Sequence, residues 1–176
     1  MIILVRHAMP EVVPEVPPEG WHLSQEGRES AARLATLLPA NAAVVSSEEP
    51  KAWETVAASS DDVVRDRRFN EVRRPAEPWR ADVRPHRMRY VAGALHPGWE
   101  RHVDVAARFQ AAVDEHVSRV DGRPVVIATH GMAMTLWLVG RGAILPADAG
   151  DFWSDLRFPD CFVVDAATGA AHRRAG

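Results

Sequence analysis

The chain has 176 residues, 47% of them hydrophobic, and a formal net charge of −3 at pH 7. Length and composition predict one domain, residues 1–176, with a core that needs neither disulfides nor a structural metal, and the charge gives no bias toward nucleic acid. The single cysteine, Cys161, cannot form an intramolecular disulfide, and no apolar run is long enough for a signal peptide or a bilayer span. We therefore expect a cytoplasmic protein with no membrane partner.

The first forty residues predict a strand, a loop and a helix. The apolar run 1–5 predicts a strand, and the proline-rich segment 10–20 excludes regular helix and central strand. Ser24 is a candidate N-cap for a helix that Pro39 stops. The apolar positions of that helix recur at helical spacing: Ala31, Leu34, Ala35 and Leu38.

The next elements are shorter. Residues 42–45 predict a second strand, and 50–58 predict a helix with proline in its first turn. Residues 63–64 predict a short third strand. From 65 to 97 arginines, prolines and tryptophans replace any regular period, so we expect an irregular excursion that lies over a functional site.

Regular patterns return in the second half. Helical periodicity marks 103–117, an apolar run marks a fourth strand at 124–129, and 132–139 predicts another helix. Residues 161–164 predict a final strand. Strands that alternate with helices indicate an α/β fold, a three-layer α/β/α sandwich with a mostly parallel central sheet.

Two of these strands each lead into a histidine. Arg6 and His7 follow the first strand, and His130 and Gly131 follow the fourth. Because the ligand crevice of an open α/β sheet lies at the carboxyl ends of its strands, both histidines are expected in one active site. An arginine there offers a planar fork for phosphate or carboxylate oxygens, and a glycine lets backbone approach a ligand closely.

Five segments in order resemble one family. Leu4-Val5-Arg6-His7-Ala8 resembles the opening signature of the histidine phosphatase superfamily, the phosphoglycerate mutase-like proteins, with alanine where glycine is commoner. The later matches are Leu23 to Arg28, Ser46-Ser47 with Ala52 and Thr55, Phe69-Asn70-Glu71, and Thr129-His130-Gly131. The resemblance covers most of the chain and implies the phosphoglycerate mutase-like fold.

The resemblance also implies roles for individual residues. His7 matches the nucleophile that forms a phosphohistidine, and Glu71 matches the acid that protonates the leaving group. Arg6, Lys51, His130 and Gly131 match positions around the phosphoryl group. Glu48 and Glu49 are reserve candidates for the acid. The family works without a metal or other cofactor, so the expected partner is a small phosphorylated substrate, with the oligomeric state left open.

The chain departs from the family pattern at two positions. Lys51 stands where a second arginine is most common, and it is the only lysine beside twenty arginines. It keeps the positive charge but loses the bidentate fork. Val13 stands near a place where mutases tend to carry asparagine. Both changes favour a phosphatase over the alternatives, which are mutase-like phosphotransfer, a phosphohistidine protein phosphatase and a lapsed, non-catalytic phospho-ligand binder.

The segment from Arg65 to Arg89 holds nine arginines against four acidic residues. Either these arginines are a solvated, salt-bridged surface, or they hold a second anionic group of the substrate by bidentate contacts. Under the second interpretation, substrates with a further phosphate or carboxylate are preferred. The first candidates for that contact are Arg73, Arg74, Arg80 and Arg84.

Overall fold

The computed structural model describes residues 1–78, 82–165 and 168–174. Within them, a six-stranded sheet has the order β3-β2-β4-β1-β5-β6. The strands are β1 (Ile2–Arg6), β2 (Ala43–Ser46), β3 (Val63–Arg65), β4 (Val125–Thr129), β5 (Asp160–Val164) and β6 (Ala171–Arg173). The first four are parallel to their neighbours, whereas β5 runs antiparallel to both β1 and β6. The predicted, mostly parallel sheet is confirmed.

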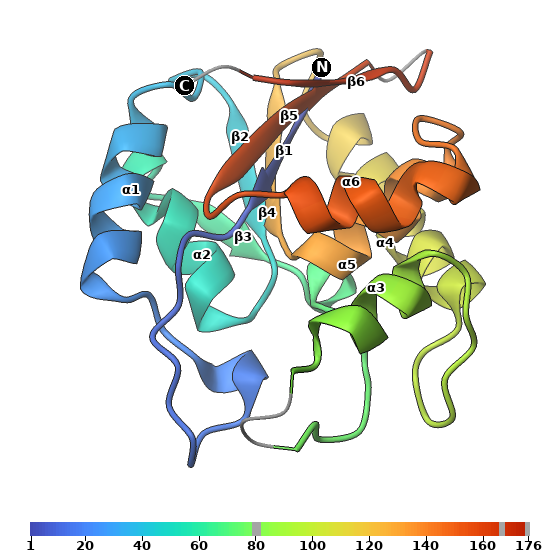
Figure 1. Ribbon diagram of the computed structural model, residues 1–176. Coiled ribbons are helices and arrows are strands. Elements are labelled where there is room, and N and C mark those ends of the chain that lie inside the picture. The colour runs from blue at the N-terminus through green and yellow to red at the C-terminus, as the bar shows by residue number, and fades with distance from the viewer. Residues whose placement is uncertain (79–81, 166–167, 175–176) are drawn as a thin grey trace.

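Helices cover both faces of this sheet (Figure 1). One face carries α1 (Gln25–Ala35) and α2 (Pro50–Val56). The other carries α3 (Arg84–Val91), α4 (His102–Ser118), α5 (Gly131–Gly140) and α6 (Ala149–Asp155). The three-layer α/β/α architecture predicted from the sequence is therefore confirmed. Among the described residues, no helix is both long enough and apolar enough to cross a membrane.

The central strands send alternate side chains into two cores. Ile2 and Leu4 of β1 belong to the core beneath α4 and α5, whereas Ile3 and Val5 belong to the core beneath α1 and α2. Successive side chains of a strand point to opposite faces, so a strand covered on both sides must be apolar at every position. This is why the first and fourth strands could be predicted as unbroken apolar runs.

Local signals also set the helix boundaries. The Ser24 hydroxyl oxygen accepts a hydrogen bond from the Gly27 N–H at 3.0 Å, so the predicted N-cap of α1 is confirmed. Pro50 is the first residue of α2, where its missing N–H leaves no helical hydrogen bond unmade.

Three elements differ from the sequence prediction. The segment 65–97 was expected to be irregular, which is wrong for Arg84–Val91, because these residues form α3. The sequence analysis also missed α6 and β6. Helix α3 buries only Tyr90 and Val91 among its eight residues and has no apolar stripe. Its packing on α6, where Gly150 leaves room for Met88, is a tertiary contact that no local period reveals.

Strand register brings three chain segments to one edge of the sheet. Arg6 of β1 lies opposite Thr129 of β4, and Ser46 of β2 lies opposite Ala128 of β4. The next residue of each strand, at 7, 47 and 130, therefore leaves the sheet at the same edge.

Candidate active site

The structure brings His7 and His130 together, as their positions after β1 and β4 predict. Their ring centroids are 5.2 Å apart, and the His7 N–H donates to the Thr129 carbonyl at 3.0 Å. The His7 side chain and backbone leave 7% of the residue exposed, and His130 is fully buried. Two imidazoles thus meet at a carboxyl-end crevice, each with one face toward the other.

The protonation of His7 follows from its neighbours. Its Nδ1 lies 2.8 Å from the Ala8 carbonyl oxygen, which can only accept a hydrogen bond, so Nδ1 carries the proton. Nε2 of the neutral ring then holds a lone pair. Burial lowers the pKa of His7 well below its ordinary value, and the charges of His130 and Lys51 lower it further. His7 is therefore a neutral imidazole with a nucleophilic Nε2 at neutral pH.

Helix α2 fixes the loop that holds His7. The Ala8 N–H donates to Thr55 Oγ1 at 2.8 Å, and the Thr55 hydroxyl donates to the Lys51 carbonyl at 2.6 Å. Thr55 is fully buried. The contact sets the direction of the Ala8 peptide, and with it the direction of the carbonyl that orients the His7 ring.

The protonation of His130 follows from a hydrogen-bond chain. Asn70 Oδ1 accepts from the Glu48 N–H at 2.9 Å and from the Ser47 hydroxyl at 2.8 Å. The Ser47 hydrogen is thereby used, so the contact of 2.8 Å between Ser47 Oγ and His130 Nε2 requires a proton on Nε2. Nδ1 of His130 is buried without a hydrogen-bond partner within residues 1–78, 82–165 and 168–174. Burial, the largest cause, lowers the pKa of His130 well below its ordinary value.

Arg6 is held by the segment that follows α6. Its Nη1 donates to the Leu156 carbonyl at 2.7 Å, and its guanidinium carbon lies 3.6 Å from the centre of the Phe158 ring. Phe158 also lies beside His7, with 5.2 Å between the ring centroids. Burial lowers the pKa of Arg6 to about 10, so the side chain stays charged at neutral pH. Sequence reasoning missed Phe158 and Leu156, because nothing in a short loop before a strand marks them.

Gly131 begins α5 and has a steric role. A Cβ atom there would lie 3.0 Å from Trp153 Nε1 and 3.3 Å from Arg6 Nε. The glycine therefore lets the Arg6 and Trp153 side chains approach the first turn of the helix. The sequence analysis expected the close approach at this glycine to come from a ligand.

Lys51 is buried and already paired. Its Nζ donates to Glu49 Oε2 at 2.5 Å and to the Pro18 carbonyl at 2.6 Å, which uses two of its three hydrogens. Lys51 is 6% exposed and Glu49 is 7% exposed. The Lys51 charge lowers the pKa values of both His7 and His130, which places the ammonium group beside the two rings.

The second oxygen of Glu49 faces the opposite way. Glu49 Oε1 accepts from the Glu71 N–H at 2.8 Å and lies 3.5 Å from His130 Nε2. One buried carboxylate thus touches the lysine, the backbone of the candidate acid and the second histidine. Glu48, the other reserve candidate, is exposed and contributes its backbone N–H to Asn70.

Glu71 caps the amino-terminal end of α5. Its Oε1 accepts from the Ala133 N–H at 2.9 Å and from the Val72 N–H at 3.0 Å, and its Oε2 accepts from the Met132 N–H at 3.3 Å. Backbone donors and the helix dipole both favour an ionised carboxylate at this position. The structure therefore brings the candidate acid to the site, in a setting that favours its charged form while the site is empty.

Two of the four arginines proposed for a second anion are ion-paired to acids. Arg73 is largely exposed and lies 3.2 Å from Glu100 Oε1. Arg74 Nε lies 3.1 Å from Glu77 Oε2. A third candidate, Arg80, lies outside the described residues.

The arginines of α3 lie nearer to Arg6. Arg84 donates through Nη2 to the Ser154 carbonyl at 2.7 Å, and Arg87 is paired with Glu77. The positive charges of Arg84 and Arg87 both lower the pKa of Arg6, which indicates that they approach its guanidinium group. Arg87 was not among the candidates, because the sequence did not reveal that α3 is a helix with two arginines three residues apart.

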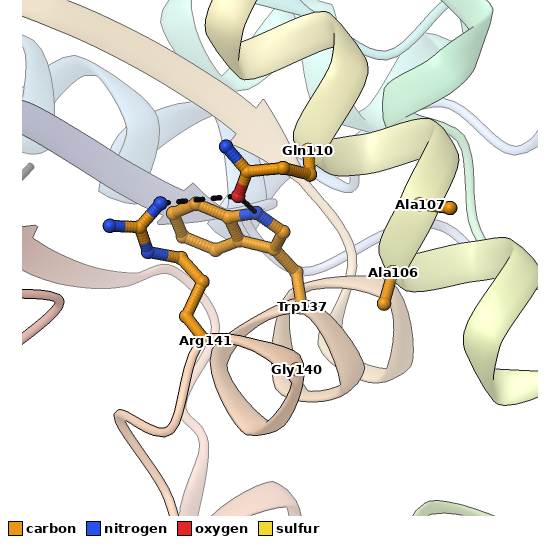
Figure 2. Close-up of a pocket in the computed structure, with 6 residues that line it drawn as sticks. All are labelled: Ala106, Ala107, Gln110, Trp137, Gly140 and Arg141. Atoms are coloured by element: carbon orange, nitrogen blue, oxygen red, sulfur yellow. Dashed lines mark hydrogen bonds between the residues drawn. The ribbon is translucent and has the colours of Figure 1, made fainter.

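The clearest hollow of the surface lies elsewhere. Figure 2 shows a hollow of about 230 Å³ between α4 and α5, where Gln110 Oε1 accepts from Trp137 Nε1 at 2.8 Å and from Arg141 Nη1 at 3.1 Å. It lies at the opposite end of α5 from His130 and contains none of the candidate site residues. The chemistry therefore points to the sheet edge, where the titratable groups converge, and not to this hollow.

No group of three or more histidine, cysteine, aspartate or glutamate side chains in the described part of the chain is arranged to hold a metal ion. The metal independence expected from the sequence stays a prediction.

Known proteins share this sequence pattern and fold. The model of the histidine phosphatase superfamily (branch 1) matches residues 2–154. The uncharacterized protein Rv0525 of Mycobacterium tuberculosis is 31% identical over 158 residues, which make up 81% of this chain and 74% of that protein.

Solved structures agree with the family match at the level of the fold. A mycobacterial glucosyl-3-phosphoglycerate phosphatase, Rv2419c, complexed with VO3, has a TM-score of 0.71 at 21% identity, covering 99% of this chain and 96% of that one. YhfR of Bacillus stearothermophilus has a TM-score of 0.68 at 22% identity, with the same coverage. A phosphoserine phosphatase of Entamoeba histolytica has a TM-score of 0.69 at 15% identity, covering 99% and 94%.

Proposed function

The chain belongs to the histidine phosphatase superfamily, branch 1, and from that premise we propose that it is a metal-independent phosphomonoesterase acting on a small phosphorylated metabolite. The observation that carries the proposal is the state of His7. Its Nδ1 proton is held by the Ala8 carbonyl, its pKa is lowered by burial, and its Nε2 is left as a nucleophile. An imidazole in this state needs no separate base.

The reaction has two steps. His7 Nε2 attacks phosphorus while the bond from phosphorus to the ester oxygen breaks, and Glu71 gives the departing oxygen a proton. Water then attacks the phosphohistidine, Glu71 takes the proton from that water, and the bond from phosphorus to nitrogen breaks. Because Glu71 is held as an ionised helix cap in the empty site, its proton must be acquired when the negatively charged substrate arrives.

The transferring group needs donors around its three equatorial oxygens. Arg6 supplies a charged guanidinium, and Lys51 supplies the remaining hydrogen of its ammonium group. The first turn of α5, which begins at Gly131, directs its N–H dipoles toward the same edge, where His130 lies.

A second candidate function is a binding protein for phosphorylated ligands without turnover. The contact between Glu49 and Lys51 favours it, because a buried carboxylate offsets the cation that replaces the family's arginine. Mutase-like phosphotransfer and protein phosphohistidine hydrolysis stay as further alternatives within the family.

We propose that the substrate carries a second anionic group. Arg84 and Arg87 support this, since both approach Arg6 from α3 and extend the positive potential beyond the phosphoryl site. Arg73 and Arg74, which are paired to Glu100 and Glu77, are weaker candidates than the sequence alone indicated.

The test is a substrate panel in excess chelator at low ionic strength. Aryl phosphates should be hydrolysed without added metal, and esters with a second phosphate or carboxylate should have the higher kcat/KM. Salt should reduce that preference, because it screens exposed charges. No turnover of any ester would favour the binding protein, and equal kcat/KM values for singly and multiply anionic esters would exclude the second anion site.

Lys51→Ala should lower kcat/KM on the order of 10²-fold, as loss of one donor to the transition-state oxygens does. It should also destabilise the fold by about 3–5 kcal/mol, because Glu49 would stay buried without its cation. Lys51→Arg keeps the charge and should be milder in both respects. Steady-state kinetics and urea unfolding of the two variants separate these effects. An alanine variant with wild-type kinetics would show that Lys51 has only a structural role.

A further inference from the structure

The empty site has balanced charge. Two cations, Arg6 and Lys51, face two carboxylates, Glu49 and Glu71, while burial keeps both histidines neutral. A phosphoryl dianion that entered this site unchanged would leave an excess of negative charge among buried groups, which is costly in a low-dielectric environment. The site therefore needs one more positive charge when it is occupied.

His130 is the group placed to supply that charge. Its Nε2 proton is used by Ser47, so in the neutral ring Nδ1 presents a lone pair, which repels a phosphoryl oxygen. Only the imidazolium form can donate from Nδ1 to such an oxygen while it keeps the Ser47 contact. The unpartnered Nδ1 is thus a donor in the occupied site and an idle acceptor in the empty one.

Glu49 is the counter-ion for that imidazolium. Its Oε1 lies 3.5 Å from His130 Nε2, and its Oε2 contacts Lys51 at 2.5 Å, so it is buried between the two groups that would change on binding. When an anion takes the Lys51 ammonium, the carboxylate remains within reach of His130. A carboxylate at this distance favours the charged form of a histidine.

We propose that Glu49 is a positioning residue that couples anion binding to the uptake of one proton at His130. The inference rests on the proposed phosphoryl site. It requires nothing of the leaving group, so it can be tested by binding alone.

Other charged groups also face His130, and their balance sets the direction. Lys51 from α2, Arg74 from the loop after Glu71, and Arg108 from α4 oppose its protonation. Glu71 favours protonation, and the neutral ring of His7 packs alongside. The three cations explain why His130 stays neutral in the empty site, and a bound dianion reverses that balance.

The probe is sulfate, a tetrahedral dianion that is not hydrolysed and whose charge does not change near neutral pH. Calorimetric titration at pH 7 in buffers of different ionisation enthalpy should show about one proton taken up per sulfate bound by the wild type. The association constant should then fall about tenfold for each pH unit, as linkage to one proton requires. The sign follows because binding raises the affinity of His130 for its proton, so binding is strongest at low pH and weakens as pH rises.

Glu49→Gln should take up less than half a proton, so its association constant should change less than about threefold per pH unit. Glu48→Gln is the matched control, because it removes the neighbouring exposed carboxylate and should behave as the wild type. Nitrogen-15 spectra of labelled histidine in the wild type should show the Nδ1 of His130 becoming protonated when sulfate is added, which needs no variant.

Three outcomes would overturn the inference. They are sulfate binding without proton uptake, proton uptake that leaves the His130 nitrogen signals unchanged, and a Glu49→Gln variant whose affinity drops equally at every pH. Each of these leaves the proposed hydrolysis standing if the substrate panel shows turnover. Absence of both turnover and sulfate binding would remove the proposed function and this inference together.

Discussion

His7→Ala should abolish turnover, with a loss on the order of 10⁶-fold, because an enzyme that loses its nucleophile keeps only the stabilisation given by the rest of its site. In the wild type, rapid quenching with a radiolabelled ester should trap a phosphate that is stable in base and labile in acid, as expected for phosphohistidine. Peptide mapping should place that phosphate on His7. The variant should bind no phosphate covalently.

A control histidine separates the chemistry from general damage. His172 lies on the exposed face of the edge strand β6, so His172→Ala should keep full activity. Because His7 is buried, circular dichroism and urea unfolding of His7→Ala must show a folded protein before its kinetics are interpreted. A folded His7→Ala protein that still hydrolyses aryl phosphates would rule out the phosphohistidine mechanism.

Glu71→Gln should lower kcat for alkyl phosphates by about 10²- to 10⁴-fold and affect activated aryl phosphates far less. The reason is the leaving group, since an alkoxide needs a proton to depart and a nitrophenolate does not. The glutamine oxygen can still accept from the N–H groups of Met132 and Ala133, so the cap of α5 is partly kept. Steady-state kinetics with a series of esters of increasing leaving-group pKa would give the dependence directly.

Glu48→Gln and Glu49→Gln are the comparisons for that series. Neither should change the dependence on the leaving group, although Glu49→Gln should change phosphate affinity with pH. Equal losses of Glu71→Gln on alkyl and aryl esters would show that Glu71 acts only as the cap of α5. A leaving-group dependence that appears in Glu49→Gln instead would transfer the acid role to that residue.

The sequence was sufficient for the sheet and for the two histidines. Strands β1 and β4 are buried on both faces, so their apolar runs are unbroken, and the residue after each strand had to lie at one edge. Helix α3 and strand β6 were not predictable in the same way. The first has arginines where a buried stripe would be, and the second has three residues at an edge.

The environment of the site residues was less accessible from sequence. Glu48 and Glu49 look alike in the chain, yet one is exposed and the other is buried against Lys51 and His130. The cap that Glu71 forms on α5 joins segments about sixty residues apart, so no local pattern reveals it. The stacking of Phe158 on Arg6 depends on β5 running antiparallel to β1, which returns the chain to the same edge.

The position of β1 in the sheet has a consequence for biosynthesis. This strand is made first, but its neighbours are β4 and β5, which begin at Val125 and Asp160. A growing chain on the ribosome therefore carries five apolar residues without their strand partners until most of the protein has emerged. Contacts between residues so far apart in sequence also slow folding. Since Arg6 gains the Leu156 carbonyl only near the end of synthesis, the nascent chain completes its anion site among the last contacts that it forms.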